Sequence, residues 1–202
     1  MKIDWLSRLA LEIGRPNGDS AQAGLLQGLE DVADDDHDAI CVWFHSLIEK
    51  ADALDDRPLA ASLFADHCPC ISPEIEDNVG KNFRDAADLP DFVARLNDDG
   101  LFSDVIRLEG NVLIATKQPW ERYGMHDHDG CFSKACHCWL ASHARAPISD
   151  LFCHCCTVGY YGKMFKSALG VDIRVELIES VISGGKGCTA AIYLPEKGDV
   201  AT

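Results

Sequence analysis

Basic residues are scarce in this sequence. Only 18 lysines and arginines stand against 33 aspartates and glutamates, which gives a formal net charge of -15 at pH 7. Such an excess of negative charge repels the phosphate backbone of nucleic acids and the anionic surface of a membrane. We therefore expect no nucleic-acid partner and no membrane partner, and we expect a small molecule as the ligand or substrate.

Long apolar runs are missing as well. Neither the N-terminus, which reads Met1-Lys2-Ile3-Asp4-Trp5, nor any later stretch is apolar for long enough to form a secretory signal or a membrane span. We expect a cytoplasmic protein. Because the cytoplasm is reducing, the ten cysteines should remain thiols, with at most one disulfide. Their clustering therefore needs an explanation.

Internal repeats, low-complexity tracts and clear linkers are also absent, and 47% of the 202 residues are hydrophobic, which is enough for a sizeable core. The pattern predicts an α+β fold with a helical region over 1–100 and a cysteine-rich α+β region over 101–202, together in one compact domain. The second region should contain an antiparallel sheet with hairpins at about 103–117 and 171–194, and a short helix at about 158–169.

Apolar residues recur at helical spacing in the first hundred residues. One stripe starts at Trp5 and another at Ile40, and an acidic run, Asp34 to Asp36, precedes the second. Carboxylates complement the positive end of a helix dipole, so this run predicts a helix N-terminus. Two residues of the second helix, Cys41 and His45, are interpreted as buried core residues.

Two hairpins make up the predicted sheet. Alternation over Val105–Glu109 and an apolar run over 112–116 indicate a hairpin, and the segment 118–147 that follows indicates a loop with one short helix around Trp139. Near the end of the chain, Thr157 is the expected N-cap of a helix that stops at Gly170. Strands over 171–183 and 188–194 should then follow, joined by a turn at 184–187.

The expected register of this last hairpin determines which face of the sheet carries the Glu179 side chain. If Ser183 faces Cys188 across the turn, then Glu179 faces Ile192, and Glu179 and Cys188 share one face of the sheet. Glu179 also has the parity of the core-facing Leu177. A buried carboxylate is costly unless it is paired, neutral or bound to a cation. The alternative is that Glu179 lies near the strand end and reaches solvent or an arginine.

Cysteines come in close groups that also contain histidine. The groups are His67-Cys68-Pro69-Cys70, Cys136-His137-Cys138 and Cys153-His154-Cys155-Cys156. Cysteine and histidine together favour zinc or another late transition metal. If the last group is extended, Cys153 and Cys155 point the same way, and a helix that starts beside them would lower a thiol pKa. His126 and His128, near Cys131, are possible ligands too, although a solvated loop is the favoured interpretation there.

The end of the chain resembles the L-2-amino-thiazoline-4-carboxylic acid hydrolase family. The resemblance covers about Leu151 to Leu194 and rests on Cys153-His154-Cys155-Cys156-Thr157-Val158-Gly159-Tyr160-Tyr161, Met164-Phe165, Gly170-Val171, Val175-Glu176-Leu177-Ile178-Glu179-Ser180-Val181, Gly184-Gly185 and Cys188. The segment is more distantly similar to the 4-vinyl reductase domain, a small-ligand module. That similarity implies a zinc site with Glu179 and Cys188 among its ligands, completed by Cys153, Cys155 or Cys156.

The resemblance implies a hydrolase that acts on a carbon–nitrogen bond, other than a peptide bond, in a small, cyclic, sulfur-containing molecule. Cys153 or Cys155 would be the nucleophile or a metal ligand, Glu179 the general base or a ligand, and His154 a proton carrier. Four aromatic residues are expected as pocket walls: Trp120, Trp139, Tyr160 and Tyr161. The candidate metal ligands are Cys153, Cys155, Cys156, Glu179, Cys188, Cys136, Cys138, Cys68 and Cys70.

Two functions of other classes stay open. The chain is alternatively a non-catalytic binding or sensing module that holds a small ligand, zinc or an iron–sulfur cluster; a brown colour would indicate the cluster and a colourless protein zinc. It is also consistent with a thiol-based redox sensor, in which the reactivity of Cys155 or Cys156 changes on oxidation.

Overall fold

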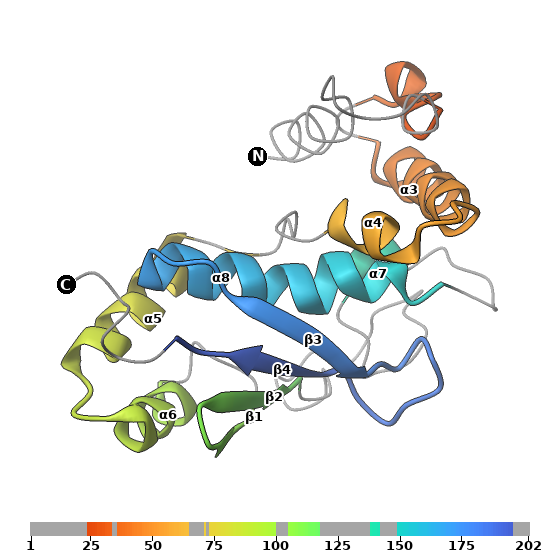
Figure 1. The fold of residues 1–202 in the computed structure, drawn as a ribbon. Coiled ribbons are helices and arrows are strands. Elements are labelled where there is room, and N and C mark those ends of the chain that lie inside the picture. Colours follow the sequence, from red (N-terminus) through yellow and green to blue (C-terminus); the bar gives the residue numbers. More distant parts are fainter. Residues whose placement is uncertain are drawn as a thin grey trace.

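Helices and one antiparallel sheet make up the described part of the chain, which confirms the predicted α+β class (Figure 1). The structure is a computed structural model, and it describes residues 24–33, 36–64, 71, 73–99, 105–117, 138–141 and 149–195. The predicted stripe from Trp5 lies outside these residues. Among them, no helix is long and apolar enough to cross a membrane.

Aspartates begin three of the helices. Helix α3 covers His37–Asp52, and the Asp36 side chain accepts a hydrogen bond of 2.9 Å from the backbone N–H of Ala39. Asp56 and Asp88 cap α4 (Arg57–Ser62) and α6 (Leu89–Asp98) in the same way. These caps satisfy N–H groups that have no partner inside the helix. The predicted helix start beside the acidic run is therefore confirmed. A further helix among the described residues, α5, covers Pro73–Asp85, and a 3-10 turn, η1, covers Leu29–Asp31.

The sheet has the strand order β1-β2-β4-β3, with all neighbours antiparallel. Its strands are β1 (Val105–Glu109), β2 (Val112–Thr116), β3 (Arg174–Glu179) and β4 (Thr189–Tyr193). The β1–β2 hairpin is the predicted one, and its turn uses Gly110 at a φ of 67°, a backbone conformation that favours glycine. A 3-10 turn, η3, covers Trp139–Ala141 as expected.

The register predicted for the last hairpin is wrong. Glu179 pairs with Thr189, and Leu177 pairs with Ala190, with a bulge between Leu177 and Glu179. The strands are shorter than predicted because residues 181–184 turn away from the sheet. Val181 and Ile182, which were expected to extend the strand, pack against the core around α3 instead. A bulge re-aims the side chains beyond it, so the parity argument for Glu179 fails.

A single run of helical backbone extends from Leu151 to Leu169. It comprises α7 (Leu151–Cys153), a π-helical turn, η4 (His154–Val158), and α8 (Gly159–Leu169). It ends at Gly170 with a φ of 71°, as predicted. Thr157 is not the expected N-cap: it lies inside the π-helical turn and is 0% exposed, because the helix begins well before it.

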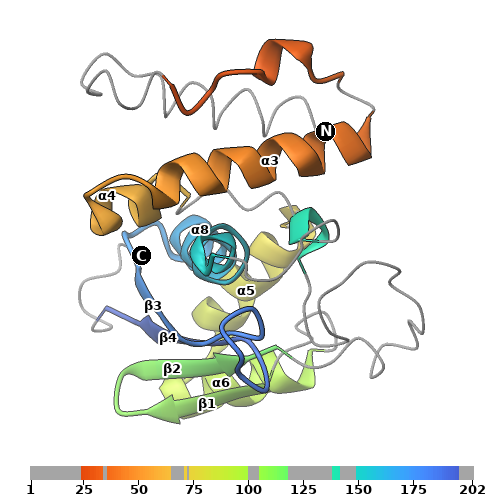
Figure 2. The same cartoon turned by 90° about the vertical axis from the view of Figure 1, so that its right-hand side faces the viewer.

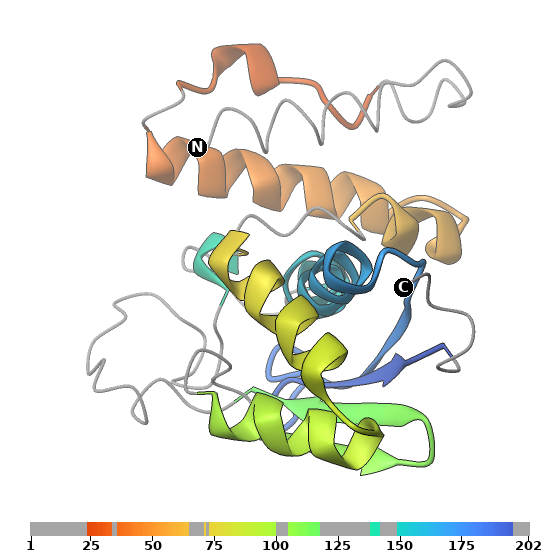
Figure 3. The same cartoon turned by 90° about the vertical axis from the view of Figure 1, so that its left-hand side faces the viewer.

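This helix lies between α3 and the sheet (Figure 2). Tyr161, Met164 and Phe165 of α8 pack on one face of the sheet, together with α5 and α6 (Figure 3). Phe152 of α7 belongs to a second core, in which it meets Phe44 of α3 edge to face at 5.4 Å between ring centroids. The N-terminal end of the helix, and with it Cys153, is therefore placed where the two cores meet.

Candidate functional site

Two buried cysteines from distant parts of the chain lie in contact. Cys153 is the last residue of α7, and Cys188 directly precedes β4. Their exposed fractions are only 3% and 4%, and the Cys153 thiol forms a hydrogen bond with the sulfur of Cys188. As predicted, Cys153 lies beside Cys188. We call these two residues the thiol pair.

The pKa values of the two thiols in this pair are shifted in opposite directions. The hydrogen bond from Cys153 lowers the pKa of Cys188 to about 7, against the opposing effect of burial. The backbone N–H of Val181 and the charge of Lys117 act in the same direction. The same contact, followed by burial, raises the pKa of Cys153, because a second negative charge beside the first is unfavourable. The thiolate form is therefore favoured on Cys188, and the proton is favoured on Cys153.

A buried lysine stands next to the thiol pair. Lys117 is 6% exposed, and its backbone N–H donates a hydrogen bond of 3.0 Å to the carbonyl oxygen of Cys188. Its Nζ lies 3.4 Å from the Sγ of Cys156 and 4.8 Å from the ring centroid of Tyr160. Sequence reasoning missed Lys117. The available signal was a lysine placed directly after the apolar strand that ends at Thr116.

The loop of residues 180–188 forms one wall of this site. The Ser180 hydroxyl donates to the Ser183 hydroxyl at 3.0 Å and accepts from the Ser183 N–H at 3.1 Å. The Gly185 N–H donates to the Ser180 carbonyl at 2.8 Å, and the Lys186 N–H donates to the Glu179 carboxylate. Backbone and side-chain hydrogen bonds thus fix the loop against the sulfur atoms.

Gly185 is expected to be the least replaceable residue of this loop. A Cβ atom there would overlap the Glu179 side chain and come within 2.8 Å of the Ser180 carbonyl oxygen. We expect Gly185→Ala to lower the free energy of unfolding by about 1–3 kcal/mol, measured by urea denaturation. Gly187→Ala is the matched control, because its Cβ would meet nothing closer than 3.7 Å. Equal stability of the two variants would contradict the loop geometry.

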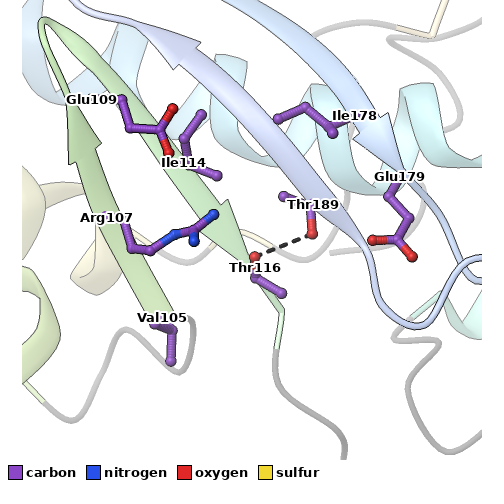
Figure 4. A pocket seen from close by; sticks show the side chains of 8 residues that line it. All are labelled: Val105, Arg107, Glu109, Ile114, Thr116, Ile178, Glu179 and Thr189. Atoms are coloured by element: carbon purple, nitrogen blue, oxygen red, sulfur yellow. Dashed lines mark hydrogen bonds between the residues drawn. The ribbon is translucent and has the colours of Figure 1, made fainter.

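Glu179 does not share a sheet face with Cys188, which corrects the predicted arrangement. Beyond the bulge, Glu179 pairs with Thr189, and both line a cavity on the face opposite the helices (Figure 4). Cys188, one residue before Thr189, points to the helix-covered face, where Cys153 lies. The Glu179 carboxylate instead accepts the Lys186 N–H and so closes the loop.

The cysteine group at 153–156 is helical, not extended as predicted. Consecutive helical residues are rotated by about 100°, so Cys153 and Cys155 point in different directions. Cys155, Cys156 and Cys138 pack in the core around α3, where Cys41 also lies, as expected. Burial lowers the pKa of His154, and the charges acting on it are those of Asp150 and Arg57, which form an exposed ion pair.

Several predicted site residues lie outside the described residues. They are Cys68, Cys70, Cys136, the His126–Cys131 segment and Trp120. The six cysteines that the structure describes are all thiols. Within the described ranges, no group of three or more histidine, cysteine, aspartate or glutamate side chains is arranged to hold a metal ion. Zinc or iron–sulfur binding therefore stays a prediction.

Tyr160 and Tyr161 differ in how they relate to the site. Tyr160 is half-buried and lies under the Lys117 ammonium, so it forms part of the surroundings of the site. Tyr161 is fully buried in the core between α8 and the sheet, and its ring centroid lies 6.0 Å from the Lys117 Nζ, farther than that of Tyr160. No protein-family description, curated protein or solved structure matches this chain.

Proposed function

We propose that this chain is a thiol-dependent hydrolase that cleaves a carbon–nitrogen bond, other than a peptide bond, in a small molecule. The observation that carries the proposal is the thiol pair, because it supplies a thiolate on Cys188 near neutral pH with a proton donor, Cys153, in direct contact. The resemblance of residues 151–194 to the thiazoline-carboxylate hydrolase family supports a cyclic amidine as the substrate class.

The reaction would proceed in two steps. In the first, the Cys188 thiolate adds to the electrophilic carbon, the carbon–nitrogen bond breaks, and the leaving nitrogen takes the proton of Cys153. In the second, water attacks the carbon, the carbon–sulfur bond breaks, and Cys188 leaves as a thiolate. The proton released by water returns to Cys153. One water is consumed, and both sulfurs regain their starting protonation.

The surrounding residues support this division of roles. Lys117 places a positive charge beside the sulfur atoms, which favours the thiolate over the thiol. Cys188 is 4% exposed, so a substrate would reach its sulfur only when the 180–188 loop moves, and the return of the loop would exclude water from the first step. In this proposal Glu179 holds the 180–188 loop in place through its hydrogen bond with the Lys186 N–H. Cys155 contributes by packing in the core around α3.

Turnover of a cyclic amidine tests the proposal. We expect the purified chain to consume L-2-amino-thiazoline-4-carboxylate, followed by proton NMR. Cys188→Ser should abolish turnover, and Cys153→Ala should lower kcat by about 10²–10⁴, the usual contribution of a positioned proton donor. Cys41→Ala, a core cysteine of α3, is the control and should retain activity.

Two results would contradict the proposed function. The first is full activity of a folded Cys188→Ser variant, because the proposed nucleophile would then be dispensable. The second is the absence of turnover by the wild-type chain across a panel of cyclic amidines and small amides. Far-UV circular dichroism of each variant verifies that a lost activity is not a lost fold.

A further inference from the structure

A cavity of about 540 Å³ lies on the sheet face opposite the helices (Figure 4). Side chains from all four strands line it, and its volume falls within the range of about 300–1,000 Å³ typical of small-molecule sites. The thiol pair is on the other face of the sheet, so this cavity does not contain it, and Glu179 is the residue that lines the cavity and also accepts the Lys186 N–H of the 180–188 loop. We ask which ligand chemistry its side chains fit.

The first relevant feature is an arginine that has no acidic partner among the described residues. Arg107 and Arg84 have no ion pair within the described residues, whereas Arg57, Arg95 and Arg174 each pair with a carboxylate, and of the two Arg107 lines this cavity. This is notable in a chain with 33 acidic and 18 basic residues. Figure 4 shows its guanidinium directed from β1 toward Thr116 and Thr189. A planar guanidinium beside hydroxyl groups is suited to bind a carboxylate.

The second feature is negative charge at the same cavity. Glu109 follows Arg107 by two positions on β1, so both side chains lie on one face of the sheet, and Glu109 has no ion pair within the described residues either. Glu179 adds a second carboxylate. One cation and two anions make the cavity unfavourable for a simple anion, whereas a ligand that also carries a positive group is attracted.

The third feature is exposed apolar surface at the rim. Val105 and Ile178 are 40% and 56% exposed, and they are two of the four large hydrophobic side chains exposed among the described residues. Both line this cavity. Because an apolar ligand group would cover them, they complete a site with a carboxylate end, a cationic end and an apolar body.

We propose that this cavity binds a free α-amino acid with an apolar side chain. Arg107 receives its carboxylate, with the hydroxyls of Thr116 and Thr189, which are 3.1 Å apart, as further polar partners. Glu109 receives its ammonium group. The apolar side chain covers Val105 and Ile178. The site goes beyond the proposed hydrolase function, because its two main polar residues, Arg107 and Glu109, lie on β1 and have no role in the proposed hydrolysis.

Binding of three related compounds to the full chain tests this site. L-leucine carries both charged groups, 4-methylpentanoate lacks the ammonium, and 3-methylbutylamine lacks the carboxylate. By isothermal titration calorimetry we expect leucine to bind, and each of the other two to bind at least about tenfold more weakly, because one charge-assisted hydrogen bond is lost. Equal binding of leucine and 4-methylpentanoate, or no binding of leucine at millimolar concentration, would overturn the proposal.

Variants locate the site. Arg107→Gln and Glu109→Gln should each weaken leucine binding at least about tenfold. Arg174→Gln is the matched control, because Arg174 is a surface arginine of β3 that already pairs with Glu176 and stacks on Tyr193, and it should bind leucine as the wild type does. Unchanged binding by Arg107→Gln would overturn the assignment. Cys188→Ser should bind leucine normally, which separates this test from that of the hydrolase function.

Discussion

Replacing Phe44 by alanine is expected to lower the free energy of unfolding by about 3–5 kcal/mol. Phe44 is 0% exposed and meets the rings of Phe64 and Phe152 edge to face, at 5.9 and 5.4 Å between centroids. Removing its ring therefore leaves a cavity between α3 and α7, and the lost contacts are not replaced. Urea denaturation followed by circular dichroism measures the change.

Val42 provides the control on the same helix. It is 62% exposed, so Val42→Ala should change the free energy of unfolding by less than about 0.5 kcal/mol. The comparison also tests the predicted single domain. If Phe44→Ala melts α3 while the sheet and α8 unfold separately at their original denaturant concentration, then residues 36–64 form a unit of their own.

The reactivity of Cys188 toward iodoacetamide is expected to rise with pH through a midpoint near 7. The thiolate is the reactive form, and a lowered pKa makes it appear at lower pH. Cys153→Ala removes the largest cause of the lowered pKa, and the burial that remains acts in the opposite direction. The midpoint should therefore move upward by about 2 pH units or more, toward or beyond the ordinary value near 9.

Rates at one pH are less informative than the midpoint. At pH 7 the thiolate fraction should fall from about half to about 1%, but the more basic thiolate is intrinsically more nucleophilic, so the rate falls by less than the fraction does. Trypsin cleaves after Lys186 and Lys197, which yields a peptide whose single cysteine is Cys188. An unchanged midpoint in Cys153→Ala would contradict the contact between the two sulfurs.

The sequence predicts the regular parts of the fold well and the last hairpin poorly. Alternation over Val105–Glu109 and a glycine turn specify β1 and β2, since each strand has one covered face. The same reasoning failed at Val181 and Ile182, whose apolar side chains pack against a core outside the sheet. The local sequence pattern cannot distinguish packing within the sheet from packing in the core around α3. The bulge before Glu179 then places the Glu179 side chain on the sheet face opposite to the predicted one.

The thiol pair could be foreseen only in part. Proximity of Cys153 to Cys188 follows from their positions beside the same hairpin, but the helical state of residues 153–157 does not, because cysteine, histidine and threonine are weak helix formers. Burial of Leu151 and Phe152 at the start of the helix outweighs that weakness. Lys117 was missed because a single lysine after a strand is ordinarily a solvent-exposed residue.

The position of Cys153 relative to Cys188 depends on the number of residues in the π-helical turn at His154–Val158. Such a turn holds one more residue than an α-helical turn, so it amounts to a one-residue insertion in the helix from Leu151 to Leu169. Deleting Thr157 would restore a regular α-helix and rotate Cys153 by about 100° around the axis relative to α8. In evolutionary terms, the loss of one codon would separate the two sulfurs while every cysteine remained in the sequence.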